Sequence, residues 1–287
     1  MENCIYKIKT LEFDNTIFDS VCDCTYVILC CGDNPHRLPN VMKQINILRP
    51  TRYVKLIFNK GYKQCPISIS VNNDLVNIQK YVFKDALSRG YKRILFLEDD
   101  FQLLKPIQQE YIDEICCFIN KNKTNVYSLG NFMIPDPMTL FSHHQRPILN
   151  HVGMTHAMFY DNISMKACYD YFHNFKGDRK VLSLDFSLAY VPNISIYRYY
   201  KPIIMQLLPE TENQKHGWEN QAGKVFAYIS IKGVKMLGLD KQLQPGFDIL
   251  YMVPFVLYLL CMIIILLTVK YIYYLNTNNN KNNRIQN

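Results

Sequence analysis

The sequence predicts an α/β fold with a mixed, mainly parallel sheet and flanking helices, followed by one C-terminal transmembrane helix. Over the first hundred residues, short continuous apolar segments alternate with segments of helical periodicity. The apolar segments are typical of strands covered on both faces, and the alternation favours parallel strands joined by crossover helices. Near the other end, residues 249–269 carry no charge.

The predicted elements follow one another in order, with turn signals between them. We expect strands at residues 26–31, 53–58 and 94–97, separated by helices at 38–48 and 74–89. The sequence Gly32-Asp33-Asn34-Pro35 ends the first strand. Asn73 is the expected cap of the second helix, and Gly90 is expected to end it. The second half is less regular, with expected strands at 126–129, 157–160 and 194–197 and a helix at 165–172.

The uncharged segment at residues 249–269 is long enough to cross a membrane. A helix of this length rises roughly 32 Å, against a hydrocarbon core of about 30 Å. The first thirty residues lack the basic and apolar regions of a signal peptide. We therefore expect a single-pass protein with a C-terminal anchor and its globular domain in the cytosol. The expected parts are an N-terminal extension (1–20), one globular domain (21–230), a juxtamembrane stalk (231–248), the transmembrane helix (249–269) and a disordered polar tail (270–287).

Composition narrows the class of protein. Of the 287 residues, 49% are hydrophobic and 20% charged, which excludes wholesale disorder. The net charge of +8 suits a small anionic substrate or a lipid surface better than nucleic acid. The ten cysteines form no pair of CxxC motifs, which argues against structural zinc, and we expect reduced thiols. Three glycosylation sequons begin at Asn122, Asn162 and Asn193, but an Asn-rich chain contains such matches by chance.

Three consecutive carboxylates, Glu98, Asp99 and Asp100, end the apolar strand of residues 94–97. The carboxyl end of such a strand opens onto the crevice where α/β sheets bind ligands. Side chains alternate along a strand, so we expect Glu98 and Asp100 on one side, where a divalent cation would relieve their repulsion. Oxygen ligands suit Mn²⁺ or Mg²⁺, which in turn holds a diphosphate. The alternative is that the triplet forms a solvated turn capping the next element.

An apolar strand that runs into Glu-Asp-Asp about 70 residues after the first strand resembles glycosyltransferases with the GT-A fold. More narrowly, it is similar to glycosyltransferase family 25, the lipopolysaccharide-biosynthesis and procollagen-galactosyltransferase group. The stretch Gly153 to Tyr160 and the isolated Asp185 follow in the family's order, whereas the first strand lacks the family's Asn-Leu-Asp pattern. The resemblance implies a Rossmann-like GT-A domain that transfers a hexose, with inversion, from a UDP-sugar to a hydroxyl of a glycan, protein or lipid.

Particular residues are candidates for roles in this reaction, the metal ligands from the resemblance and the others from their positions along the predicted elements. The expected ligands of Mn²⁺ (or Mg²⁺) are Glu98, Asp100 and His216. The nucleotide-sugar donor is expected to contact Arg37, Asn59, Lys60 and Asp99. Asp185 is the candidate general base, and His156 and Trp218 are expected to contact substrate.

Each assignment has a structural alternative. The alternative for Asp185 is a helix N-cap beside Ser183. The alternative for His216 and Trp218 is that they lie in an exposed juncture before the membrane segment. Arg37, Asn59 and Lys60 are of types that often lie on the surface without a ligand. For the whole chain, the alternatives are a catalytically inert membrane-anchored protein that keeps the fold for binding or assembly, and a phosphoryl-transfer enzyme with paired metals. The sequence shows no second carboxylate pair as convincing as the first for the latter, and no Gly-rich phosphate loop.

Overall fold

The structure is a computed structural model of the chain. It describes residues 4–29, 37–65, 67–68, 70–103, 106–122, 124–130, 142–146, 155–173, 187–199, 203–206, 232, 236 and 248–285. The chain divides into two compact units, Met1–Phe247 and Asp248–Asn287, and each is described by itself.

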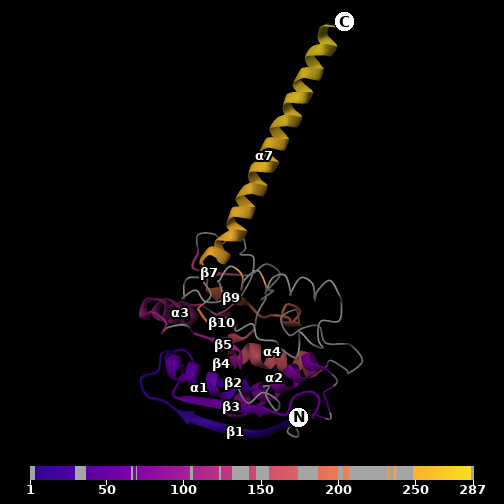
Figure 1. Ribbon diagram of the computed structural model, residues 1–287. Helices are drawn as coiled ribbons and strands as arrows, with labels where there is room; N and C mark the ends of the chain where they lie inside the picture. The colour runs from indigo at the N-terminus through magenta and orange to yellow at the C-terminus, as the bar shows by residue number, and fades with distance from the viewer. Residues whose placement is uncertain are drawn as a thin grey trace. The chain divides into compact units, whose positions relative to one another are not determined.

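The described part of the first unit contains an eight-stranded sheet with the strand order β1-β3-β2-β4-β8-β6-β9-β7 (Figure 1). Its strands are β1 (Ile5–Glu12), β2 (Cys24–Leu29), β3 (Tyr53–Asn59), β4 (Arg93–Glu98), β6 (Val126–Ser128), β7 (His144–Gln145), β8 (Ala157–Asp161) and β9 (Ile196–Tyr199). A second, two-stranded sheet pairs β5 (Phe101–Gln102) with β10 (Met205–Gln206).

The sheet is mixed, and its parallel part is smaller than the sequence predicts. Strands β3, β2 and β4 run parallel, as do β6 and β9. Strand β8 lies between these two groups and is antiparallel to both β4 and β6. The two outermost strands, β1 and β7, are also antiparallel to their neighbours. The expected parallel strands joined by helices are therefore found in the first half of the chain, where strand and helix alternate.

Helices cover both faces of the sheet. On one face, α1 (Arg37–Leu48) and α3 (Gln109–Lys121) bury Ile45 and Ile115 against Val27 of β2. On the other, α2 (Val71–Ser88) and α4 (Asn162–His173) bury side chains against Ile28 of the same strand. Alternate side chains of β2 thus enter opposite cores, which explains why Tyr26 to Leu29 form a continuous apolar segment.

The N-terminal residues differ from the prediction. The range 1–20 was expected to be an extension, but it contains β1, which pairs with β3 along its whole length. In β1 the exposed Lys7 and Lys9 interrupt the apolar positions, so the strand lacks the continuous apolar signature of a central strand. The cap of α2 also differs, because the Ser70 hydroxyl, rather than Asn73, accepts the backbone N–H that caps the helix. Gly90 follows the helix with φ 72°, as expected for a terminating glycine.

Two buried cysteines are joined in a disulfide. Cys4, just before β1, bonds to Cys65 in the connection between β3 and α2, with 4.9 Å between their Cα atoms. Two contacts hold the segments around the bond: the Lys60 N–H donates to the Cys4 carbonyl at 2.9 Å, and the Ser68 hydroxyl oxygen lies 3.1 Å from Cys65 Sγ. The expectation of reduced thiols is therefore wrong for this pair.

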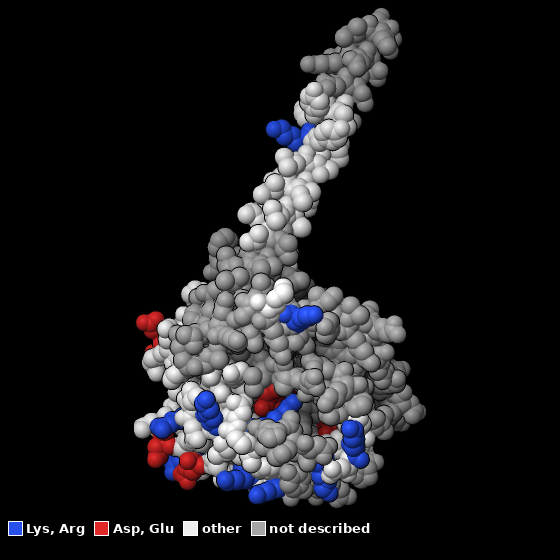
Figure 2. All heavy atoms as spheres, in the orientation of Figure 1, with Lys and Arg blue, Asp and Glu red and all other residues white. Residues whose placement is uncertain are grey.

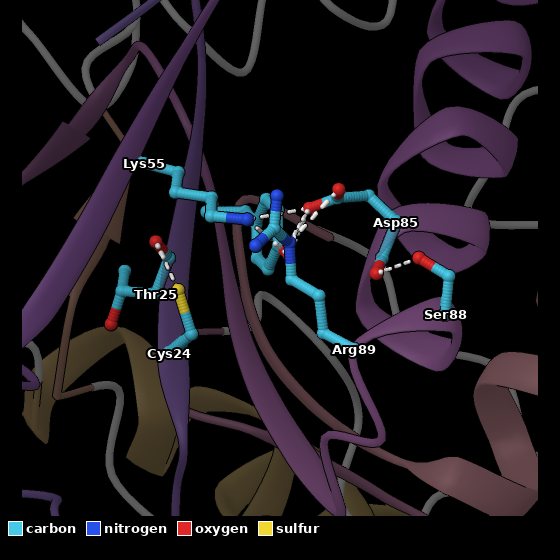
Figure 3. A network of polar contacts seen from close by, with 7 residues as sticks. Cys24, Thr25, Lys55, Asp85, Ser88 and Arg89 are labelled. Atoms are coloured by element: carbon cyan, nitrogen blue, oxygen red, sulfur yellow. Dashed lines mark hydrogen bonds and ion pairs between the residues drawn. The ribbon is translucent and has the colours of Figure 1, made fainter. Parts of the chain in front are cut away.

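A charged network joins the sheet to α2 at the amino ends of the parallel strands (Figure 3). Lys55 Nζ of β3 and the Tyr26 hydroxyl of β2 each donate to Asp85 Oδ2 at 2.6 Å. Arg89 Nε donates to Asp85 Oδ1 at 3.0 Å. Burial alone would raise the pKa of Asp85, but these three hydrogen bonds outweigh it and lower the pKa. The network thus fixes α2 on the parallel strands through one carboxylate.

The second unit is the helix α7 (Asp248–Ile285). It is the one helix in the described part of the chain that is long and apolar enough to cross a membrane, with a mean hydropathy of 2.0 over Tyr258–Leu275. Figure 2 shows uncharged side chains along most of its described length. The helix continues to Ile285, beyond the predicted end of the span at residue 269 and through most of the range predicted as a disordered tail.

The Asp85 network makes a testable contribution to stability. In the detergent-solubilised full chain at pH 7, we expect Asp85→Asn to cost about 1 to 3 kcal/mol, because it weakens the bonds to Lys55 and Arg89. That loss corresponds to a fall in Tm of about 2 to 4 °C per kcal/mol. Since folding lowers the pKa of Asp85, its contribution is present above the ordinary value of 3.8 and is lost as the pH falls below it.

The measurement is thermal unfolding of wild type and variant at pH 7 and pH 3. The control is Asp170→Asn, which removes an exposed pair with Lys166 on α4 and is expected to change stability by less than about 1 kcal/mol. Equal effects of the two substitutions at pH 7 would contradict a stabilising role for the network.

Candidate functional site

The acidic triplet lies where β4 ends, at the carboxyl edge of the parallel strands. Glu98 is the last residue of β4 and pairs in register with Ile28, close to the end of β2. Asp99 and Asp100 follow in a turn before β5, and their exposed fractions are only 4% and 6%. The predicted strand alternation therefore reaches only as far as Glu98. Burial of Asp99 and Asp100 also contradicts the alternative of a freely solvated turn.

Arg37 and Asp99 form an ion pair between their side chains, although 62 positions separate them in the sequence. Arg37 is the first residue of α1, the helix that follows β2, and Asp99 follows β4. Because β2 and β4 are adjacent parallel strands, their continuations meet at one edge of the sheet. Two residues predicted to contact the donor are thus brought together.

Glu98 is held by the beginning of β8. The Thr155 hydroxyl donates to Glu98 Oε1 at 3.0 Å, and the Glu98 N–H donates to the His156 carbonyl at 2.9 Å. Thr155 is buried and was not predicted as a site residue. The signal that could have indicated it is its place in the Gly153 to Tyr160 stretch, directly before a predicted strand. A hydroxyl donor to one oxygen of Glu98 restricts the rotation of that carboxylate.

His156 is not available to an acceptor in this structure, which corrects the prediction. Its ring is 1% exposed, and Nε2 lies 2.9 Å from the Ile204 carbonyl, to which it donates. Burial lowers the pKa of His156 to about 4, so the ring is neutral at pH 7. The ring lies against Gly130, where any added Cβ would collide with it and with the Ile204 carbonyl. His156 therefore joins β8 to the segment that leads into β10.

Asn59 also differs from its predicted role. It ends β3 at the same edge, but its side chain is fully buried, and Nδ2 donates to Asp74 Oδ2 at 2.5 Å. Asp74 lies in the first turn of α2 and also accepts from the Ser68 hydroxyl at 2.8 Å. Asn59 thus anchors the start of α2. Lys60 beside it is partly exposed, so a ligand can reach its side chain, as the predicted contact with the donor requires.

Three predicted site residues, Asp185, His216 and Trp218, lie outside the described residues. Their roles as base, metal ligand and substrate contact remain predictions.

The donor atoms of the triplet suit a divalent cation that shares its coordination with a ligand. In the described ranges, no group of three or more His, Cys, Asp or Glu side chains is arranged to hold a metal. Mg²⁺ is commonly bound by one or two carboxylates together with substrate phosphates, rather than by a complete protein cage. Glu98 and Asp100 supply carboxylate oxygens of this kind. The residues are of the type that such a cation prefers, and their joint binding of a cation and a diphosphate remains a prediction.

Comparison with known proteins gives little independent information. No family model matches the chain, and no curated protein matches it. One similar solved structure is a glycosyltransferase involved in the glycosylation of the major capsid of PBCV-1, with 8% identity and a TM-score of 0.40, covering 66% of this chain and 95% of that one. Another is mannose-1-phosphate geranyltransferase from Thermus thermophilus, with 10% identity and a TM-score of 0.32, covering 66% and 75%. With TM-scores below 0.5, these likenesses support no argument about fold or activity.

The buried His156 predicts a pH dependence of stability. Because folding lowers its pKa from 6.5 to about 4, the unfolded chain binds a proton at a higher pH than the folded chain does. Its contribution is complete above pH 6.5 and is lost as the pH falls toward 4. The variant His156→Gln replaces the ring N–H donor by an amide N–H donor that cannot titrate. We expect it to flatten the decline of Tm over this interval.

The measurement is thermal unfolding of the full chain between pH 7 and pH 4. His173→Gln, at an exposed position on α4, is the control for the substitution itself and should keep the decline seen in the wild type. An unchanged pH profile in His156→Gln would contradict burial of the neutral ring.

Proposed function

We propose that this protein is a metal-dependent glycosyltransferase that moves a hexose from a nucleotide-sugar, expected to be a UDP-sugar, to a hydroxyl of a glycan, protein or lipid. The observation that carries the proposal is the meeting of Arg37 with the acidic triplet at the carboxyl ends of β2 and β4. The resemblance of the triplet and its strand to GT-A enzymes supports the same reaction.

The chemistry of sugar transfer explains why charges of both signs are needed here. The reaction breaks the bond between the sugar and a nucleoside diphosphate, and negative charge accumulates on the departing diphosphate. Glu98 and Asp100 would hold Mn²⁺ or Mg²⁺, which would supply Lewis-acid stabilisation of that charge when bound. Thr155 fixes the orientation of Glu98 through its hydrogen bond, so this carboxylate is positioned before any donor binds.

Arg37 is suited to bind the diphosphate directly. A guanidinium presents several N–H groups in a plane and can donate two of them to one phosphate. In the structure its Nη1 contacts Asp99, which orients the group at the sheet edge. We assign Arg37 to donor binding and Asp99 to the positioning of Arg37.

The acceptor hydroxyl requires a base, and Asp185 is proposed for that role. Trp218 is proposed to contact substrate and His216 to complete the metal ligands. The apolar helix α7 is proposed to anchor the enzyme in a membrane as a single-pass protein.

The second candidate is a catalytically inert membrane-anchored protein that keeps the fold for binding or assembly. The burial of His156 and Asn59 is compatible with it, because two residues expected to contact ligands have packing roles instead. Substitutions in the acidic triplet distinguish the two candidates, since an inert scaffold has no activity to lose.

Asp100→Asn tests the proposed metal site. We expect the full chain in detergent micelles with Mn²⁺ to hydrolyse one nucleotide-sugar of a panel, and Asp100→Asn to lower this rate by at least about 100-fold. Chelation of the metal should have the same effect in the wild type. Release of nucleoside diphosphate is the measurement.

Asp170→Asn, on the exposed surface of α4, is the matched control and should retain full activity. Wild type that releases diphosphate from no member of the panel favours the inert scaffold. Undiminished activity of Asp100→Asn would exclude the proposed metal ligand.

Arg37→Ala tests donor binding. Loss of charge-assisted hydrogen bonds to the diphosphate should lower kcat/KM for the donor about 10- to 100-fold. Arg37→Lys keeps the charge but not the planar pair of donors, so it should recover part of the loss. Steady-state kinetics with varied donor concentration are the measurement. A change confined to the KM of the acceptor would contradict the assignment.

A further inference from the structure

The three sequons lie on exposed positions at the ends of secondary structure elements. Asn122 is the first residue after α3, Asn162 begins α4, and Asn193 lies in a turn with φ 58°. All three asparagines are exposed. The Asn122 amide donates to the Phe118 carbonyl at 2.9 Å through one hydrogen, so its second amide hydrogen can be replaced without loss of that bond.

The sequons converge on one place in the fold, although they span 74 positions from Asn122 to Ser195. The residue that joins them is Asn125, directly after the first sequon. Its carbonyl accepts from the hydroxyl of Ser164, the third residue of the second sequon, at 2.8 Å. Its side-chain Oδ1 accepts from the hydroxyl of Ser195, the third residue of the third sequon, at 3.0 Å.

This place lies at one end of the central strands, and the acidic triplet lies at the other end. The second sequon follows directly on Asp161, which pairs in register with Arg93 at the start of β4. The triplet begins at Glu98, the other end of the same strand. With a rise of about 3.3 Å per residue, the two ends of β4 are roughly 17 Å apart. The sequons and the proposed donor site therefore lie at opposite ends of β4.

The disulfide is an independent observation that indicates the same compartment. Disulfides form and persist in oxidising compartments and are rare in the cytosol. Cys4 and Cys65 are both buried, with exposed fractions of 2% and 4%, and join segments that are 61 positions apart. Compartments of the secretory pathway that oxidise thiols are also those in which asparagine sequons are glycosylated.

We propose that Asn122, Asn162 and Asn193 carry N-linked glycans and that the first unit faces an oxidising, glycosylating compartment. Each modification forms a bond between the amide nitrogen and the anomeric carbon of an oligosaccharide. It breaks the anomeric bond to a lipid diphosphate, which leaves with the electron pair, while the amide loses one proton. The proposal replaces the cytosolic location expected from the sequence alone, and it is independent of the proposed catalytic activity.

The test is expression of the full chain in cells with a secretory pathway, followed by treatment with an endoglycosidase specific for N-linked glycans. We expect a mobility shift on removal of glycans, with one step lost in each of Asn122→Gln, Asn162→Gln and Asn193→Gln. Thr124→Ser and Ser195→Thr are the matched controls, because they keep the sequons and should keep the glycans. A sequon appended after Asn287 should stay unmodified, since α7 would separate it from the first unit.

Peptide mapping without reduction tests whether the compartment is oxidising. We expect a peptide pair linked through Cys4 and Cys65. Absence of any endoglycosidase-sensitive modification would overturn the proposal. So would modification of the appended sequon alone, because it would place the first unit on the other side of the membrane. Neither readout depends on enzymatic activity, so a failure of the proposed function leaves this test intact.

Discussion

The burial of β4 on both faces is the constraint on which the rest of the structure depends. Four of its six residues, Ile94 to Leu97, have no exposed surface, and β2 and β8 pair with its two sides. Such a strand has no room for an internal charge. Its polar residues are therefore confined to its ends, where Arg93 begins it and Glu98 ends it. One strand thereby separates the edge with the acidic triplet from the edge with the sequons.

The elements that the sequence predicts well are those whose burial leaves a clear local pattern of apolar residues. The continuous apolar segments of β2, β3 and β4, and the periodicity of α1 and α2, follow from burial that one segment shows by itself. Strand β1 gives no such signal, because it lies at an edge and Lys7 and Lys9 remain in solvent. Short strands such as β7 and β10 depend on partners far away in sequence, and no local pattern indicates them.

In the candidate site too, some features follow from a local pattern and others depend on partners that are distant in sequence. The acidic triplet could be recognised from its position after an apolar segment, but its contact with Arg37 required knowledge of the strand order. His156 and Asn59 were singled out because polar side chains of these types lie at the ends of predicted strands. In the structure these side chains satisfy a carbonyl and a carboxylate inside the protein. Residue type shows which chemistry is available, whereas burial decides whether it is directed to a ligand or to packing.

The position of β1 has a consequence for how the chain acquires its structure during synthesis. Strand β1 is synthesised before its partner β3, so it cannot pair until residues 53–59 have followed it. Closing so long a loop is entropically costly and slows the pairing. Until then Cys4 has no native partner, since Cys65 is made later still. Strand β1 and the adjoining Cys4 thus remain without their native partners until both β3 and Cys65 have been made.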